Sequence, residues 1–322
     1  ALERAGASAA IADAGPVAQV RTFMLTDLVQ ARSARRAAER EIEAHAPAAV
    51  VYCSVTAALL WPRPGAIWLD VTAAENRPGR HGVWQRAVER RRLACAPLLL
   101  TMAGTSLDAH DGRARGPAVV VPVPVASSGS EVAGSAAGWE GAGSATGAGS
   151  VRDIDVLAYT GDPVKRRLDL ILEAWARARR GTETLVVAGL ERPPGVTPPP
   201  GVTFAGRLPP DAYRTLVRRA RVFVAAPRRE DFGIAQLEAL ADGAMLVTTP
   251  APGPYAALPI ARQLDPRLVG DDLVSGLRAA LDDPVPGYAR RAAELIAPFS
   301  PEAVAATLSQ HVLPRLLPGW RA

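Results

Sequence analysis

The chain contains few of the residues that mark several classes of protein. Its 322 residues include two cysteines and four histidines, and only 5% of them are aromatic. Two cysteines, Cys53 and Cys95, do not make the disulfide framework of a small secreted domain. We expect Cys53 to be buried, because it lies within the apolar run Val50–Val55. The histidines lack metal-ligand spacing. Because aromatics are scarce and no basic stretch is interleaved with them, nucleic acid is not an expected partner.

Long hydrophobic runs are also missing. No apolar stretch approaches the roughly 18 residues of a membrane-spanning helix, and the first residues, Ala1–Gly6, lack a signal-peptide pattern. They resemble the end of a helix, so we expect the first strand and loop of the fold to be missing from the chain. These features indicate a cytoplasmic protein. The basic cluster Arg90–Arg92 and the net charge of +5 leave open a peripheral contact with the cytoplasmic face of a membrane.

Lysine occurs once. Of the 37 basic residues only Lys165 is a lysine, which leaves 37 − 1 = 36 arginines. Such a preference usually reflects genome composition. Against that background, the single lysine either survives by chance or marks a position where a compact charge is preferred to a planar guanidinium.

Apolar runs alternate with helical stretches in both halves of the chain. In the first half we expect strands at 48–55, 66–71, 98–102 and 118–125, and helices at 28–45 and 81–94. In the second half we expect strands at 155–159, 184–188, 202–205, 222–225 and 245–249, and helices at 166–180, 211–219, 234–242, 271–281, 288–297 and 301–313. This alternation predicts an α/β protein with two Rossmann-like parallel-sheet domains.

Composition suggests where these domains begin and end. Residues 126–150 are almost entirely alanine, glycine and serine, which is typical of a flexible linker or disordered loop. We therefore expect an N-terminal domain over 1–125, the linker over 126–150 and a second domain over 151–300. Residues 301–322 should form a C-terminal helix that packs back toward the N-terminal domain. Ligands of such sheets bind beyond the carboxyl ends of the strands.

The most informative stretch runs from Glu230 to Glu238, with the sequence E-D-F-G-I-A-Q-L-E. Two acids flank a Phe-Gly step at the predicted start of a helix, where unpaired amides attract phosphate. Glu238 shares its helix face with Ile234 and Leu237, which we expect to be buried. A buried carboxylate needs partners, and sugar hydroxyls would supply them. The alternative is a glutamate at the rim of an amphipathic helix.

This stretch and two others together resemble the donor-binding region of retaining glycosyltransferases of family 4, which have the GT-B fold and an E-x7-E pattern. The other two are Y-T-G-D-P-V-K-R-R-L-D over 159–169, similar to the family's glycine loop and lysine, and G-V-T-F-A-G-R-L over 201–208, similar to its turn beside the nucleotide base. The likeness spans roughly residues 155–260. It implies two domains facing a cleft.

The resemblance implies roles for individual residues. Lys165, or Arg166 beside it, would face the donor diphosphate, while Glu230 would accept hydroxyls of the transferred sugar and Glu238 would hold the ribose. The remaining donor-side residues would be Gly161 in the glycine loop, Arg207 and Leu208 at the base, and Asp231, Phe232, Gly233 and Ile234 in the acid-flanked turn. The chain departs from the family pattern at Arg167, where a glycine usually follows the lysine.

The first half offers acceptor-side candidates. Asp70 follows a predicted strand where relatives often have a histidine, and we group it with Lys165, Arg166 and Glu230 as a catalytic candidate. Glu75, Asn76 and Arg77 lie in the next turn, and Asn76 is the only asparagine of the chain. A solvated turn that caps the next helix is the alternative.

The resemblance implies a hexosyl-type glycosyltransferase with a nucleotide-diphosphate sugar as donor and a glycan, lipid or small molecule as acceptor. It requires no cofactor and no metal, and the D-x-D sequence at Asp153–Asp155 is better explained as part of the fold. Two alternatives remain: a nucleotide-sugar epimerase or hydrolase of the same fold, and a non-catalytic nucleotide- or glycan-binding protein.

Overall fold

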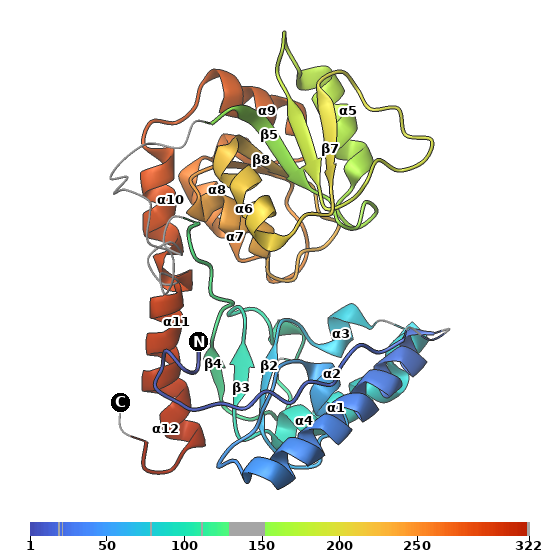
Figure 1. Cartoon of the computed structure of the whole chain (residues 1–322), viewed down its shortest axis with the longest axis vertical. Helices are drawn as coiled ribbons and strands as arrows, with labels where there is room; N and C mark the ends of the chain where they lie inside the picture. Colours follow the sequence, from blue (N-terminus) through green and yellow to red (C-terminus); the bar gives the residue numbers. More distant parts are fainter. Residues whose placement is uncertain (19, 21, 78, 111, 129–151, 321–322) are drawn as a thin grey trace, which may run out of the picture. The chain divides into compact units, whose positions relative to one another are not determined.

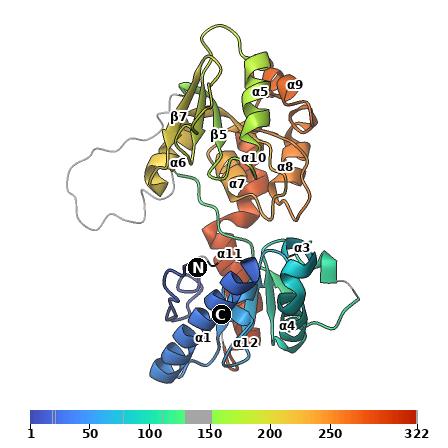
Figure 2. The same cartoon turned by 90° about the vertical axis from the view of Figure 1, so that its right-hand side faces the viewer.

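The computed structural model describes residues 1–320 except residues 19, 21, 78, 111 and 129–151. The chain forms two compact units (Figures 1 and 2). The first contains Ala1–Pro124 together with Pro301–Ala322, and the second contains Val125–Ser300. Most of the predicted linker lies outside the described residues. Its first residues belong to the second unit, where the amide of Ser128 donates to the carboxylate of Asp242 at 2.7 Å.

The N-terminal unit is built on a four-stranded parallel sheet in the order β1-β2-β3-β4. The strands are β1 (Val51–Tyr52), β2 (Ala66–Leu69), β3 (Leu99–Thr101) and β4 (Ala118–Val120). All four fall within predicted strands, but each is shorter. The first is cut short because Ser54 caps a helix, accepting from the amide of Ala57 at 3.1 Å. Cys53 lies in this turn and is exposed, so the prediction that it is buried was wrong.

Apolar residues alternate along the sheet between two packed faces. Leu98 and Leu100 pack with the C-terminal helical segments, whereas Leu99 packs with residues of the opposite face. The C-terminal segments are α11 (Pro301–Thr307), the π-helical turn η6 (Leu308–Val312) and α12 (Leu313–Leu316). The opposite face is covered by α1 (Phe23–His45), α2 (Val55–Ala58) and α4 (Val83–Cys95). Short elements follow two of the strands: α3 (Ala73–Asn76) and η1 (Gly79–Gly82) after β2, and η2 (Asp108–His110) after β3.

The second unit has a five-stranded parallel sheet in the order β7-β6-β5-β8-β9. Its strands are β5 (Ile154–Tyr159), β6 (Leu185–Ala188), β7 (Val202–Gly206), β8 (Ala220–Ala225) and β9 (Met245–Thr248). Its helices are α5 (Leu168–Ala178), α6 (Pro210–Arg219), α7 (Ile234–Ala241), α8 (Ala257–Leu264), α9 (Leu273–Asp282) and α10 (Tyr288–Ile296), with short turns η4 (Pro266–Leu268) and η5 (Ala297–Phe299). The predicted α/β class with two parallel sheets is confirmed.

Strand β5 lies at the centre of this sheet although it is the first strand of the unit. The chain then builds β6 and β7 on one side and β8 and β9 on the other. The order therefore reverses between β5 and β8, and a parallel α/β sheet opens its ligand crevice at such a point, beyond the carboxyl ends of the strands. Two loops leave the sheet there, residues 160–167 after β5 and residues 226–233 after β8.

Candidate donor site in the second unit and acidic residues in the first

The loops after β5 and β8 are joined by hydrogen bonds. The amide of Arg228 donates to the carbonyl of Lys165 at 2.9 Å, and its guanidinium donates to the carbonyl of Val164 at 3.0 Å. Asp162 shapes the first loop from within, because its carboxylate accepts from the amides of Val164 and Lys165 at 3.1 and 2.9 Å. The basic residues after β5 are thereby held against the acid-flanked turn after β8.

A buried ion pair forms where these loops meet. The guanidinium of Arg166 contacts the carboxylate of Glu230, which is only 6% exposed. Gln236, in the first turn of α7, is also buried and donates to the same carboxylate oxygen at 2.8 Å. The side chain of Lys165 is exposed and forms no hydrogen bond or ion pair with any residue that the structure describes. The two basic candidates of this loop therefore have different environments.

Arg167 has a strained backbone. It caps the start of α5 with φ +49°, in the left-handed region that favours glycine. A non-glycine residue there costs of order 1 kcal/mol. Gly161 lies earlier in the same loop, and a Cβ at this position would lie 2.8 Å from the hydroxyl of Tyr159. Of these two positions, only Arg167 has a backbone conformation that favours glycine.

The acid-flanked turn is fixed by its backbone. Gly233 caps α7 with φ +91°, and a Cβ there would lie 2.9 Å from the ring of Tyr255. Phe232 is buried, and its ring packs edge-on against Phe299 with centroids 6.0 Å apart. Asp231 pairs with Arg229 at 2.8 Å. The structure therefore gives Phe232 and Gly233 a clear role in shaping the turn.

Helix α7 turns a different face inward from the one predicted. Its buried residues are Gln236, Leu237, Ala239 and Leu240. Ile234 is 45% exposed, so the prediction that it is buried was wrong. The glycine cap sets this rotation of the helix, because it brings Gln236 onto Glu230. Glu238 is half-buried at the boundary of the inward face, as in the rim alternative.

Arg214 is a neighbour of Glu238 that sequence reasoning missed. It lies on α6 and its guanidinium is 3.6 Å from the carboxylate of Glu238 and 3.0 Å from that of Asp242. It also donates to the hydroxyl of Ser128 at 2.9 Å and to the carbonyl of Ala126 at 2.7 Å. Among 36 arginines nothing in the sequence distinguishes Arg214. Only the packing of α6 beside α7 reveals its role.

Some buried polar groups near this edge of the sheet have no hydrogen-bond partner among the described residues. They include the hydroxyls of Thr160 and Thr249, which follow β5 and β9, and the side-chain oxygen of Gln236. An unsatisfied buried group costs about 1–3 kcal/mol. Such groups gather where a ligand or water supplies the missing bond. Arg207 and Leu208, by contrast, follow β7 at the far edge of the sheet, separated from β5 by β6.

In the N-terminal unit, the loop after β2 is held to α1 by an ion pair. Arg77 donates to the carboxylate of Asp27 on α1 at 2.9 and 3.1 Å, and Gln85 donates to the same carboxylate at 3.1 Å. Asp70 accepts from the amide of Val71 at 2.7 Å directly after β2. Asn76 is exposed and Glu75 is half-buried. Arg77, a predicted acceptor-side residue, thus has a structural partner.

Glu89 is a second buried acid that sequence reasoning missed. It lies on α4 with 2% exposure, and both of its oxygens accept from the amide of Ala73, at 2.9 and 2.8 Å. Burial raises the pKa of Glu89 to about 7. One signal is visible in the sequence, because an acid occupies a core-facing position of a helix that also buries Gln85 and Leu93.

The D-x-D sequence is used by the fold. Asp153 pairs with Arg219 at 2.6 Å, and Asp155 pairs with Arg221 at 3.0 Å. Within the described residues, no three histidine, cysteine or acidic side chains gather so as to hold a metal ion. No helix in that part of the chain is long and apolar enough to span a bilayer.

Comparison with known proteins agrees with this geometry. Residues 155–297 match the glycosyl transferases group 1 family, and the chain matches no curated protein. A sucrose-phosphate synthase from Thermosynechococcus elongatus superposes with a TM-score of 0.66 at 14% identity, covering 92% of this chain and 80% of that protein. WaaG, a glycosyltransferase involved in lipopolysaccharide biosynthesis, superposes with a TM-score of 0.65 at 15% identity, covering 94% and 86%.

A third similar structure is a trehalose-phosphate synthase from Burkholderia xenovorans in complex with glucose-6-phosphate. It superposes with a TM-score of 0.60 at 12% identity, covering 88% of this chain and 78% of that protein. These likenesses establish the GT-B fold. The family match covers most of the second unit.

Proposed function

We propose that this protein transfers a hexosyl group from a nucleotide-diphosphate sugar to an acceptor with retention of anomeric configuration. One observation carries the proposal. The family match covers the loops at the switch point of the second sheet, and there a buried carboxylate is held between Arg166 and Gln236. Breaking the glycosidic bond of the donor requires stabilisation of a departing diphosphate, which fixed positive groups and helix amides provide.

We assign a different role in donor binding to each of these residues. Lys165, which is exposed and unpaired within the described part of the chain, is the cation we assign to the diphosphate. The first amides of α7 point toward the same anion. Arg166 holds Glu230 in place for the hydroxyls of the transferred sugar. Glu238 binds the ribose, oriented by Arg214.

The donor nucleotide is proposed from similar proteins. The trehalose-phosphate synthase noted above is described as UDP-forming, so a uridine diphosphate sugar is the first donor to test. The reaction proceeds without a metal or cofactor in this proposal. It takes place in the cytoplasm, and the Arg90–Arg92 cluster leaves room for a membrane contact.

A non-catalytic sugar-nucleotide-binding protein is the second candidate. It is favoured by Arg166, whose charge is already neutralised by Glu230, and by Arg167 in the strained position of a glycine. Both features reduce the positive charge or backbone freedom available to a diphosphate.

The test is to incubate the protein with uridine, guanosine and adenosine diphosphate sugars, with and without a panel of acceptors. Acceptor-dependent nucleotide release, with a retained anomer seen by NMR, supports transfer. Release without an acceptor indicates a hydrolase, and conversion of the donor sugar indicates an epimerase. Binding by calorimetry without turnover supports the second candidate.

A further inference from the structure

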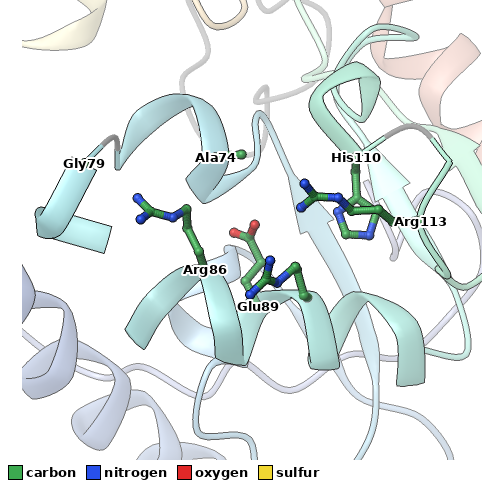
Figure 3. A pocket seen from close by; sticks show the side chains of 7 residues that line it. Ala74, Gly79, Arg86, Glu89, His110 and Arg113 are labelled. Atoms are coloured by element: carbon green, nitrogen blue, oxygen red, sulfur yellow. The ribbon is translucent and has the colours of Figure 1, made fainter. Parts of the chain in front are cut away.

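A pocket in the N-terminal unit gathers positive charge around Glu89. It has a volume of about 290 Å³ and is lined by Ala74, Gly79, Arg86, Glu89, Arg90, His110 and Arg113 (Figure 3). These residues come from three places: the turn after β2, helix α4, and the loop after β3. The pocket thus lies at the carboxyl edge of the sheet, where an α/β unit binds its ligand.

The lining of this pocket is positively charged. Three arginines and one glutamate give the lining a net charge of +3 − 1 = +2 with histidine neutral. Within the described residues, no carboxylate forms an ion pair with Arg86, Arg90 or Arg113. Elsewhere many arginines are paired, for example Arg219 with Asp153 at 2.6 Å and Arg267 with Asp265 at 2.8 Å. Unpaired guanidiniums that converge on a cavity are suited to an anion.

The acid at the centre of the pocket does not neutralise this charge. In Figure 3 the carboxylate of Glu89 lies between Arg86 and Arg113, and both of its oxygens accept from the amide of Ala73. Arg86 is anchored separately, because it donates to the carbonyl of Arg77. His110 is buried on the other side and contacts the carbonyl of Ala114 at 3.4 Å. The positive side chains are thus positioned by the fold, and a single carboxylate offsets only part of their charge.

The volume and the charge of the pocket together limit the class of ligand that it can bind. Ligand pockets usually occupy about 300–1,000 Å³, so a pocket of about 290 Å³ holds a small group and not a whole nucleotide. A phosphate monoester carries a charge of about −1.5 to −2 at neutral pH, which matches the net +2 of the lining, whereas a carboxylate carries half as much.

We propose that this pocket binds the phosphate group of a phosphorylated small molecule. It lies in the same loop region as Asp70 and Glu75, so the phosphorylated molecule is the acceptor of the transferase reaction; this last step rests on the proposed function. Arg90 and Arg113 are exposed and reach the anion from the rim. Arg86 contacts it from the half-buried side.

Binding to the wild-type chain is measured by calorimetry with inorganic phosphate, a hexose 6-phosphate and the unphosphorylated hexose, at one ionic strength and without a donor. We expect both phosphates to bind and the plain hexose not to bind. Arg90→Gln and Arg113→Gln should each weaken binding by about tenfold, the usual loss for a charge-assisted contact. Arg91→Gln is the matched control, since Arg91 is an exposed neighbour on α4 that does not line the pocket.

A substitution that should strengthen phosphate binding separates the proposed role from a loss of folding, because unfolding would only weaken binding. Glu89→Gln removes the negative charge from the pocket and should tighten phosphate binding several-fold at pH 8. The charged and titratable groups that surround Glu89 are Asp70, Arg77, Arg86, Arg90, His110 and Arg113. The comparison is made at pH 8, above the pKa of about 7 to which burial raises Glu89, so that the wild-type carboxyl is ionised.

Three results would overturn the proposal: no binding of either phosphate, equal losses in Arg91→Gln and Arg90→Gln, or weaker binding in Glu89→Gln. Vesicles of phosphatidylcholine with phosphatidic acid test a lipid headgroup as the source of the phosphate. Binding to vesicles that depends on Arg113, without binding of the soluble monoester, would refute a soluble acceptor. Because no donor is present, these outcomes do not depend on whether the second unit transfers a sugar.

Discussion

The two units each bury a glutamate at the carboxyl edge of a parallel sheet, but they compensate its charge differently. In the second unit Glu230 is held by the guanidinium of Arg166 and the amide of Gln236. In the N-terminal unit the carboxylate of Glu89 accepts from the amide of Ala73 and has no other hydrogen-bond partner among the described residues, and burial raises its pKa to about 7. Burial of a charge demands either a counter-charge or a proton, and this protein uses both solutions.

The difference has a consequence for function. A carboxylate held by a guanidinium and an amide keeps one geometry, as a site for sugar hydroxyls needs. A carboxyl that takes up a proton near neutrality changes the charge of its pocket by one unit. The charge of the N-terminal pocket is therefore adjustable by pH.

Removing the counter-charge of Glu230 should have the largest effect. Arg166→Ala leaves a buried carboxylate without its cation, so we expect the free energy of unfolding of the second unit to fall by about 3 kcal/mol. Urea denaturation at pH 7 measures this, with Arg177→Ala on the exposed face of α5 as control. The double variant Arg166→Ala/Glu230→Gln should recover most of the loss. A double variant no more stable than the single one would show that the ion pair is not the cause.

Removing the unpaired cation of the same loop should affect catalysis and not stability. Lys165→Ala should lower the rate of transfer by about a hundredfold, because an electrostatic stabiliser of the leaving diphosphate is lost. Lys165→Arg should restore part of the rate, since it restores the charge. Steady-state kinetics with the active donor measures both variants. A near-normal rate in Lys165→Ala would transfer this role to Arg166.

Glu89 provides the corresponding test in the N-terminal unit. Its pKa in the folded protein is raised from the ordinary value of 4.5 to about 7, so the folded state binds more protons than the unfolded state between these values. The contribution of Glu89 to stability is therefore most favourable below about pH 4.5, and is lost as the pH rises toward 7. Glu89→Gln should remove this dependence and raise the free energy of unfolding at pH 8 by about 2 kcal/mol.

Urea denaturation from pH 5 to pH 8 measures this effect, with Glu43→Gln on the exposed part of α1 as control. If wild type and Glu89→Gln show parallel pH profiles, Glu89 is ionised throughout. The contrast between the two buried acids would then disappear.

The smallest effect is expected at the rim of α7. Glu238→Gln should weaken donor binding by about tenfold, the loss typical of one charge-assisted hydrogen bond to a ribose hydroxyl. Calorimetry with a uridine diphosphate sugar measures this affinity. Arg214→Gln should produce a similar loss, because Arg214 orients Glu238. Unchanged affinity in Glu238→Gln would show that this glutamate is only a rim residue.

Sequence reasoning succeeded where a local pattern carries the information. The predicted strand at 155–159 and helix at 211–219 match β5 and α6 to within one residue at each end, because their apolar residues follow the strand and helix periods. It failed at Cys53, which lies between the end of β1 at Tyr52 and the capping Ser54, and at Ile234, whose helix begins at a glycine cap. Both errors arise from backbone turns that apolar patterns do not encode.

Such patterns did not predict which charged residues form ion pairs with one another. Arg166 and Glu230 are 64 positions apart, and Arg77 and Asp27 are 50 apart. Which of two adjacent basic residues meets the glutamate depends on where the loop after β5 contacts the loop after β8. Because the chain has 36 arginines, residue type alone does not show which arginine pairs with a given acid.

The sequence by itself determined the class of fold, the order of strands and helices along the chain, and the position of the acid-flanked turn. Those properties depend on interactions among residues close in the chain, such as side-chain periodicity and helix capping. Only the tertiary structure decided that Arg166 pairs with Glu230 while Lys165 stays exposed, and that Glu89 lies beneath three arginines that lack acidic partners among the described residues. Electrostatic partners are set by distance in space, and the crossover connections of a parallel sheet bring together groups that lie far apart along the chain.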